Sequence, residues 1–350
     1  MSALALARRH YRLRQRLITA VVADARRLWR QVDVADLDGW FRQYGPRLVV
    51  MLAAAQLAAA RAADGYVTDT LEAQGIDPDP LGHVAAAAFS GLASDGRTLD
   101  GLLLSPVLTV KEAIGQGARP RLAVARGWAH LDMILSTQVA DAGRTADGAA
   151  LAARPRVGGY VRMLQGKSCS RCVILAGRWY RWNAGFDRHP RCDCIHIPAA
   201  EDQAGDLRTD PRQYFDSLTE AEQDRAFTKA GAQAIRDGAD MNQVVNARRG
   251  ARGLNTAAGR RTREEARALR DGRDRGSMQT ERVYGRDAFI TTEGTTSRGI
   301  AGRRLADLQK IDGQRYRRSR TPRLMPEQIY RDATSREDAI RLLRRFGYII

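Results

Sequence analysis

All four cysteines of this chain lie within 26 consecutive positions, as Cys169-x-x-Cys172 and Cys192-x-Cys194, and His189 stands three residues before the second pair. A C-x-x-C turn places two sulfurs on one side of a metal ion. A second pair, brought back by the intervening chain, supplies the other side. Cys172 and Cys192 are 20 residues apart, a separation typical of zinc sites. The cluster therefore predicts one bound zinc ion per chain.

Five side chains compete for the four ligand positions of such an ion: Cys169, Cys172, His189, Cys192 and Cys194. The C-x-C pair presents both thiols on one face if its backbone is extended. His196 is a weaker sixth candidate. The alternative is four buried, inert thiols, but the clustering of every cysteine in one segment favours a metal.

A structural zinc site is expected rather than a catalytic one. Five candidate ligands imply no open coordination position, whereas catalytic zinc keeps a water and needs a nearby general base. The neighbouring acids Asp187, Asp193 and Glu201 have no diagnostic spacing. We therefore predict no catalytic residue and no enzyme activity. The ion would instead hold together a module too short to form its own core.

The start of the chain, "MSALALARRHYRLRQRL", places its charges after a very short apolar run, the reverse of a secretory signal. Synthesis in a reducing cytoplasm is expected, where metal binding is favoured over disulfides. The most apolar stretch, residues 48–60, is too short for a membrane span, so a buried helix and no membrane partner are expected.

The predicted fold class is mainly α, with a small zinc-stapled α+β module containing a β-hairpin in the middle and a basic Gly/Arg-rich C-terminal region. The segments are a helical docking or assembly region (1–150), the Cys/His module (155–204), a helical extension (205–250), the basic region (251–325) and a C-terminal helix pair (326–350).

Local patterns give the expected elements. A first helix should bury Tyr11, Ile18, Val22, Ala25 and Trp29, which recur at helical spacing, and a later one should cover 122–142. Helix breaks are expected at Gly39, Pro46, Gly65 and Gly75, and a turn is expected at 77–82. In the cysteine module we expect a hairpin over 173–182 and a strand over 194–198. After it, the capping box Thr219-x-x-Glu222 should open a helix that runs toward Gly238, and Pro326 and Ser335 should begin the two final helices.

The charge is strongly positive and unevenly placed. The chain carries a net charge of +17, and 53 of its 57 basic residues are arginine, the better residue for bidentate phosphate contact. The codon usage of a GC-rich genome explains the ratio of arginine to lysine, but it does not explain the net charge. Residues 1–150 have a net charge of only +2, whereas residues 247–325 hold 21 basic and 9 acidic residues. This distribution predicts non-specific, salt-sensitive contact between the C-terminal region and DNA phosphates.

The cysteine segment "CSRCVILAGRWY…HPRCDCIHIP" resembles the signature of phage Mu F-like minor head proteins, the head-morphogenesis family of tailed phages. The matching residues are Cys169, Cys172, Gly177, Tyr180, His189, Pro190, Cys192, Cys194 and Pro198. Residues 210–250, "TTEGTTSRG" (291–299) and the C-terminal segment are similar to members from phages of high-GC hosts. The resemblance is strong over about 155–350 and looser over the helical N-terminus.

This resemblance implies a structural protein present in few copies inside the phage head, near the portal, that acts in head assembly. Its partners would be portal and capsid proteins and the packaged double-stranded DNA. It would be located in the virion, and in the host cytoplasm during assembly.

Two other classes of function remain open from the residues. One is a zinc-stapled nucleic-acid enzyme, either an endonuclease using His189 or His196 or a fused toxin-type activity using Glu293. The other is a zinc-containing DNA-binding regulator. The histidine–asparagine pairing of such nucleases is not evident, and no recognition helix stands out.

Overall fold

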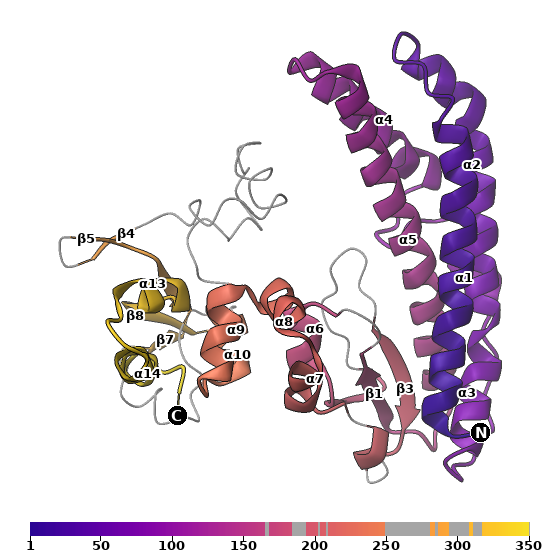
Figure 1. The fold of residues 1–350 in the computed structure, drawn as a ribbon. Helices are drawn as coiled ribbons and strands as arrows, with labels where there is room; N and C mark the ends of the chain where they lie inside the picture. The colour runs from indigo at the N-terminus through magenta and orange to yellow at the C-terminus, as the bar shows by residue number, and fades with distance from the viewer. Residues whose placement is uncertain are drawn as a thin grey trace. The chain divides into compact units, whose positions relative to one another are not determined.

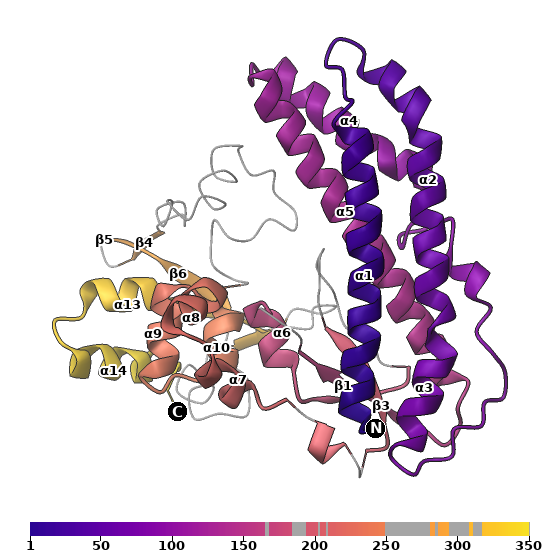
Figure 2. The ribbon, with the colours of Figure 1, turned by 45° about the vertical axis from the view of Figure 1, so that its right-hand side comes forward.

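The computed structural model describes residues 1–164, 168–183, 194–201, 204–207, 209–248, 281–283, 286–293, 308–310 and 317–349. The described chain is mainly helical with small sheets, which confirms the mainly α part of the predicted fold class, whereas the zinc-stapled character of the middle module stays a prediction (Figures 1 and 2). It forms two compact units, residues 1–168 with 175–211 and residues 169–174 with 212–350. Each unit is described by itself.

Long helices form the larger part of the first unit. They are α1 (Ala3–Trp29), α2 (Leu37–Arg61), α3 (Ala63–Glu72), α4 (Leu99–Gly115) and α5 (Pro120–Ala152), with a short 3₁₀ turn, η1 (Ala86–Phe89). Helix α5 packs against each of the other four α-helices, and α1 and α2 lie side by side in both views (Figures 1 and 2). Leucine, valine and alanine fill the core, where Trp29 and Trp40 meet edge to face with ring centroids 5.1 Å apart.

The predicted breaks at Gly39, Pro46 and Gly65 are wrong, because helices continue through all three positions. Gly39 belongs to the N-terminal cap of α2: its N–H donates to Asp36 at 2.8 Å, and a Cβ there would lie 1.9 Å from the Asp36 carboxylate. Pro46 is exposed, so water can replace the backbone hydrogen bond that it removes. Gly75 follows α3 with φ 68°, in agreement with the prediction of a break there.

The buried face of α1 differs from the predicted one. Ala25 and Trp29 are buried as expected, but Tyr11, Ile18 and Val22 are only half-buried. The buried line also includes two polar residues, His10 and Arg14. A pattern of apolar residues cannot identify such positions, because nothing local distinguishes a buried arginine from a solvated one.

A buried ion pair between α1 and α5 explains this difference. The Asp147 carboxylate accepts a hydrogen bond from Arg14 Nη2 at 2.6 Å and lies 3.0 Å from His10 Nε2. A Cβ on Gly143 would stand 2.7 Å from Arg14 Nε, so this glycine makes room for the guanidinium. Burial acts to raise the pKa of Asp147, but the nearby charges and hydrogen bonds of His10 and Arg14 outweigh it and hold that pKa well below its usual range.

Tyr66 of α3 completes this cluster. Its ring stacks on His10 with centroids 3.9 Å apart, and its hydroxyl donates to the backbone oxygen of His196 at 2.6 Å. Burial, and secondarily the charge of Asp147, raises the pKa of Tyr66 far above its ordinary value. Tyr66 therefore stays a neutral hydrogen-bond donor and ties the helices to the strand that carries His196.

The second unit combines short helices with a three-stranded sheet. Its helices are α7 (Pro211–Ser217), α8 (Glu220–Phe227), α9 (Lys229–Arg236), α10 (Met241–Ala247), α13 (Pro326–Asp332) and α14 (Arg336–Arg345). The sheet order is β6 (Ile290–Glu293), β8 (Arg317–Leu324), β7 (Leu308–Lys310), and β4 (Glu281–Val283) pairs separately with β5 (Arg286–Ala288). Of the predicted basic region 251–325, residues 251–280 and parts of the remainder lie outside the described residues.

Both capping predictions in this unit are confirmed. Thr219 and Glu222 form a capping box at α8, and the Ser335 hydroxyl accepts from Asp338 N at the start of α14. The helix expected to run toward Gly238 is instead divided at Thr228, which has φ 66°. Its side chain caps α9 by accepting from Gly231 N at 3.3 Å, so a new helix starts there.

One segment, Leu37–Glu72, is long and apolar enough by composition to cross a bilayer. It comprises α2 and α3, and buried side chains such as Leu48 and Leu52 pack in the core of the helical unit. Core helices of globular domains pass the same test of length and composition. The absence of a membrane partner stays a prediction.

Replacing Asp147 by asparagine should destabilise the first unit by about 3–5 kcal/mol, because it leaves the buried Arg14 charge without its counter-ion. Urea unfolding of the full chain, followed by far-UV circular dichroism, measures this. The control is Asp38→Asn, which breaks an exposed ion pair with Lys111 and should cost no more than about 1 kcal/mol. Equal effects of the two substitutions would contradict the proposed importance of the buried pair.

The same two proteins give a pH test. Because the folded-state pKa of Asp147 is depressed, its stabilisation is present above the unfolded value of about 4 and is lost as the pH falls below it. The gap in unfolding free energy between the wild type and Asp147→Asn should therefore shrink between pH 5 and pH 3. A constant gap would argue against a depressed pKa.

Candidate functional site

The cysteine module is built on a three-stranded antiparallel sheet in the first unit. Strand β1 (Gly159–Met163) is central and pairs with β2 (Trp179–Arg181) and β3 (Ile195–Ala199). All residues of β1 and β3 are buried, and β3 contacts α1, α3 and α5. The sheet is thus held against the base of the helices, where both ribbon views place it (Figures 1 and 2).

The hairpin predicted over 173–182 is wrong in its first half. Residues Ser170–Leu175 form a helix, α6, which ends before Gly177 (φ 68°). Strand β2 then pairs with β1 instead of with the residues before the turn. The predicted strand over 194–198 is present as β3, and Pro198 is accommodated within it because β3 is an edge strand.

Cys169 and Cys172 are positioned by α6, within the second unit. The Cys169 carbonyl accepts from Val173 N at 3.0 Å at the start of the helix. The two sulfurs are 3.5 Å apart, far beyond the disulfide bond length of about 2.0 Å. Two thiolates on one tetrahedral zinc ion, each at about 2.3 Å, would stand about 3.8 Å apart. The pair therefore fits two corners of a zinc site.

Of the other three candidate ligands, only Cys194 is described. It is 1% exposed, immediately precedes β3 and belongs to the first unit, and its carbonyl accepts from Arg144 Nη1 at 3.4 Å. His189 and Cys192 lie outside the described residues. The described ranges contain no group of three potential metal-ligating side chains, so the complete ligand set stays a prediction from sequence.

His196, the weaker sixth candidate, is buried on β3, an edge strand of the sheet. It is opposite Arg162 in the β1–β3 register, and its ring stacks on Tyr160 with centroids 4.2 Å apart. Tyr160 stacks in turn on Tyr180 at 5.4 Å. Burial is the main influence raising the pKa of Tyr180, and it is opposed by Arg162 and Arg178. This arrangement makes His196 a packing residue of the sheet.

Sequence reasoning missed two buried arginines around this module. Arg144, 2% exposed, pairs with Asp141 of the preceding helical turn at 2.7 Å, and Arg162 is 2% exposed in the centre of β1. The i, i+3 spacing of Asp141 and Arg144 was visible in the sequence, as was the position of Arg162 as the one charged residue in "YVRML". The spacing of Asp141 and Arg144 indicates an ion pair but not its burial, whereas a lone charge inside an apolar strand suggests that Arg162 is buried.

No family model matches this chain, and no match was found among curated proteins or solved structures. The functional assignment therefore rests on the residues, the motif and the geometry.

Gly159 provides a direct test of the β1–β2 contact. A Cβ at this position would lie 1.9 Å from the Tyr180 carbonyl oxygen and 2.7 Å from the Trp179 ring. Gly159→Ala should therefore separate these strands and destabilise the module by about 1–3 kcal/mol. The matched control is Gly148→Ala in α5, where a Cβ meets nothing within 4 Å. That change should stabilise its helix by about 0.5–1 kcal/mol. Thermal unfolding of both variants measures these changes in stability. If Gly159→Ala is as stable as the wild type, the β1–β2 pairing is contradicted.

Proposed function

We propose that this chain is a structural minor capsid protein of a tailed phage that acts in head morphogenesis and lies near the portal inside the head. The observation that carries the proposal is the ordered motif from Cys169 to Pro198, with its C-x-x-C pair, Gly-aromatic turn and H-P-x-C-x-C pair. Three features support it: a unit of long helices, the small sheet of the cysteine module that packs against these helices, and a strongly basic C-terminal region.

The zinc ion in this proposal is structural. Cys169 and Cys172 would provide two ligands, and two of His189, Cys192 and Cys194 would provide the others. The sulfur–sulfur separation of 3.5 Å supports the first half of this assignment. The ion would supply a cross-link between two segments of the module and no chemistry beyond it.

The enzyme alternatives gain no support from the described residues. The His196 ring is buried beneath Tyr160, so it has no open approach for a nucleic-acid backbone. Glu293 ends β6 opposite Arg318, and its side chain lies outside the described residues. We therefore do not propose a catalytic function.

The proposal is tested by asking whether the chain is a component of purified particles. Mass spectrometry of virions purified from the phage that encodes it should detect the chain at a few copies per portal. Deleting its gene should reduce the yield of filled heads, and wild-type protein supplied in trans should restore it. If purified virions lack the chain and particles form normally without it, the proposal is wrong.

Zinc binding is expected at about one ion per chain in protein purified without added metal, as measured by elemental analysis. Cys169→Ser should reduce the metal content and lower the melting temperature, because it removes a ligand. Ser170→Ala, at the adjacent non-ligand position, should change neither. Unchanged metal content and melting in Cys169→Ser would exclude Cys169 as a ligand.

DNA binding is expected to depend on the charge of residues 251–280, which contain eight arginines. Replacing all eight by glutamine should weaken binding to duplex DNA and flatten its salt dependence, because fewer phosphate counter-ions are released. Replacement by lysine preserves charge and should retain most of the salt dependence. Binding that ignores salt, or that survives the glutamine variant unchanged, would refute phosphate contact by this segment.

A further inference from the structure

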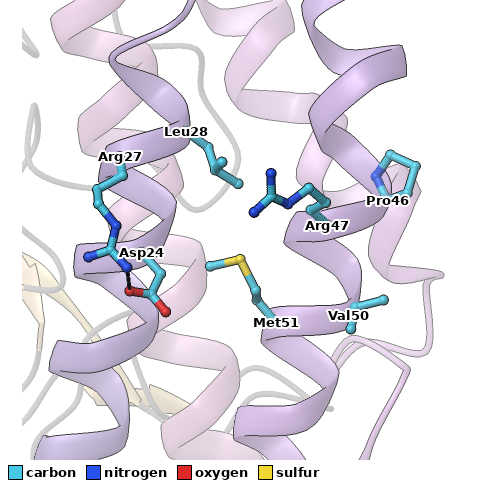
Figure 3. Close-up of a pocket in the computed structure, with 7 residues that line it drawn as sticks. All are labelled: Asp24, Arg27, Leu28, Pro46, Arg47, Val50 and Met51. Atoms are coloured by element: carbon cyan, nitrogen blue, oxygen red, sulfur yellow. Dashed lines mark hydrogen bonds and ion pairs between the residues drawn. The ribbon is translucent and has the colours of Figure 1, made fainter.

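Two cavities lie between α1 and α2 on the surface of the helical unit. One, of about 280 Å³, is lined on α1 by His10, Leu13, Arg14, Arg16 and Leu17 and on α2 by Ala58 and Ala59, with Ala62 directly after α2. The other, of about 450 Å³, lies further along the same pair of helices and is lined by Leu28, Val50 and Met51 among others (Figure 3). We call the surface from Leu13 to Leu28 and from Pro46 to Ala62 the α1–α2 groove.

The apolar part of the groove lining consists of leucine, valine and methionine side chains together with the alanines of the first cavity. Because the helices run antiparallel, the exposed alanines Ala20 and Ala54 fall between the residues that line the first cavity and those that line the second. Leu13 and Val50, at the edges, are 42% and 68% exposed. Bulky apolar side chains on a helix surface normally gain by being covered, and alanines on the floor allow close approach of another helix.

The rim of the groove is positively charged. Arg16 lines the first cavity and Arg27 and Arg47 line the second, where Arg47 points toward α1 (Figure 3). The single acid there, Asp24, is paired with Arg27. Among the described residues, Arg16 and Arg47 have no carboxylate within ion-pair distance. Helix α1 carries no acidic residue before Asp24, so nothing in its own sequence balances this charge.

Shape and charge together select the occupant. From Leu13 to Leu28 the groove spans 15 residues of helix, or about 22 Å, which matches four turns of a third helix. We propose that the α1–α2 groove binds an amphipathic helix of a partner protein, with apolar residues at i, i+3/i+4 and i+7 facing the alanine floor and acidic residues facing Arg16 and Arg47.

The two other occupants fit less well. A second copy of this chain docked through the same face would place arginine rims against each other, and like charges across an interface oppose association. A nucleic acid would satisfy the arginines but would leave the apolar floor without contacts. An acidic amphipathic helix satisfies both. This inference extends the assembly role proposed above and rests on that role only for the partner's identity as a head component.

The experiment measures binding of the full chain to a fluorescent peptide of about 18 residues, with leucines at helical spacing flanked by glutamates. The comparison probes are the same peptide with lysine in place of each glutamate, and a DNA duplex of about 20 base pairs. We expect the acidic peptide to bind at least about tenfold more tightly than the lysine peptide, and to bind less tightly as salt rises.

Matched variants locate the binding. Leu13→Gln should weaken binding of the acidic peptide at least about fivefold, whereas Leu122→Gln should not. The two leucines are similarly exposed, at 42% and 43%, but only Leu13 lines the groove. Arg16→Glu should weaken it at least about tenfold, whereas Arg121→Glu, which makes the same charge change at an exposed site on α5, should have little effect.

Four outcomes would overturn the proposal. Two concern the peptides: equal affinity for the acidic and the lysine peptide, and equal losses of affinity in the groove variants and in their controls. The third is tighter binding of the DNA duplex than of the acidic peptide, if Arg16→Glu abolishes it. The fourth is dimerisation of the chain that the groove variants disrupt. Because the assay uses purified protein, failure here would leave the recovery of the chain from virions unaffected, and absence from virions would leave this result standing. The two proposals can therefore fail independently.

Discussion

The buried Asp147 carboxylate is the interaction on which the helical unit and its attached sheet depend. It lies on α5, the helix that contacts every other long helix, and it neutralises Arg14 from the opposite side of the core. Through His10 the same cluster reaches Tyr66, which donates to the backbone of β3. A charge inside a core is tolerated only when paired and hydrogen-bonded. This requirement fixes the register of α1 on α5 more narrowly than apolar contacts alone would, because a slip by one residue would separate the pair.

The same requirement explains which parts of the fold could be predicted from the sequence. Local chemistry identified the capping box at Thr219, the cap at Ser335 and the break at Gly75, because each depends on residues within a few positions. Arg14 in the core of α1 depends on a residue 133 positions away, so no local pattern reveals it. Pro46 and Gly39 show the converse: a residue that disfavours a helix in isolation is retained where its cost is small or its absent side chain is needed.

For the candidate site, the sequence identified the residues better than it predicted their arrangement in space. The spacing of Cys169 and Cys172 anticipated two nearby sulfurs, which the first turn of α6 brings to 3.5 Å. The intervening hairpin was predicted from β-branched and aromatic residues, yet residues 173–175 are helical. Short apolar runs of this kind are ambiguous between helix and strand, and pairing partners distant in sequence decide between them. Here β2 pairs with β1 and not with the residues that precede it in the chain, and those preceding residues form a helical turn.

The distribution of charge within the fold determines what an approaching partner meets at the surface. Residues 1–150 have a net charge of only +2, a value that suggests a neutral packing module. Folding separates the charges: Asp141 and Asp147 pair with buried arginines, whereas Arg16 and Arg47 face outward beside exposed apolar side chains. The near-zero sum therefore conceals a basic groove on the α1–α2 face. Net charge along a chain indicates partners only when each charge is assigned to the interior or to the surface, because paired buried charges contribute little to what an approaching molecule encounters.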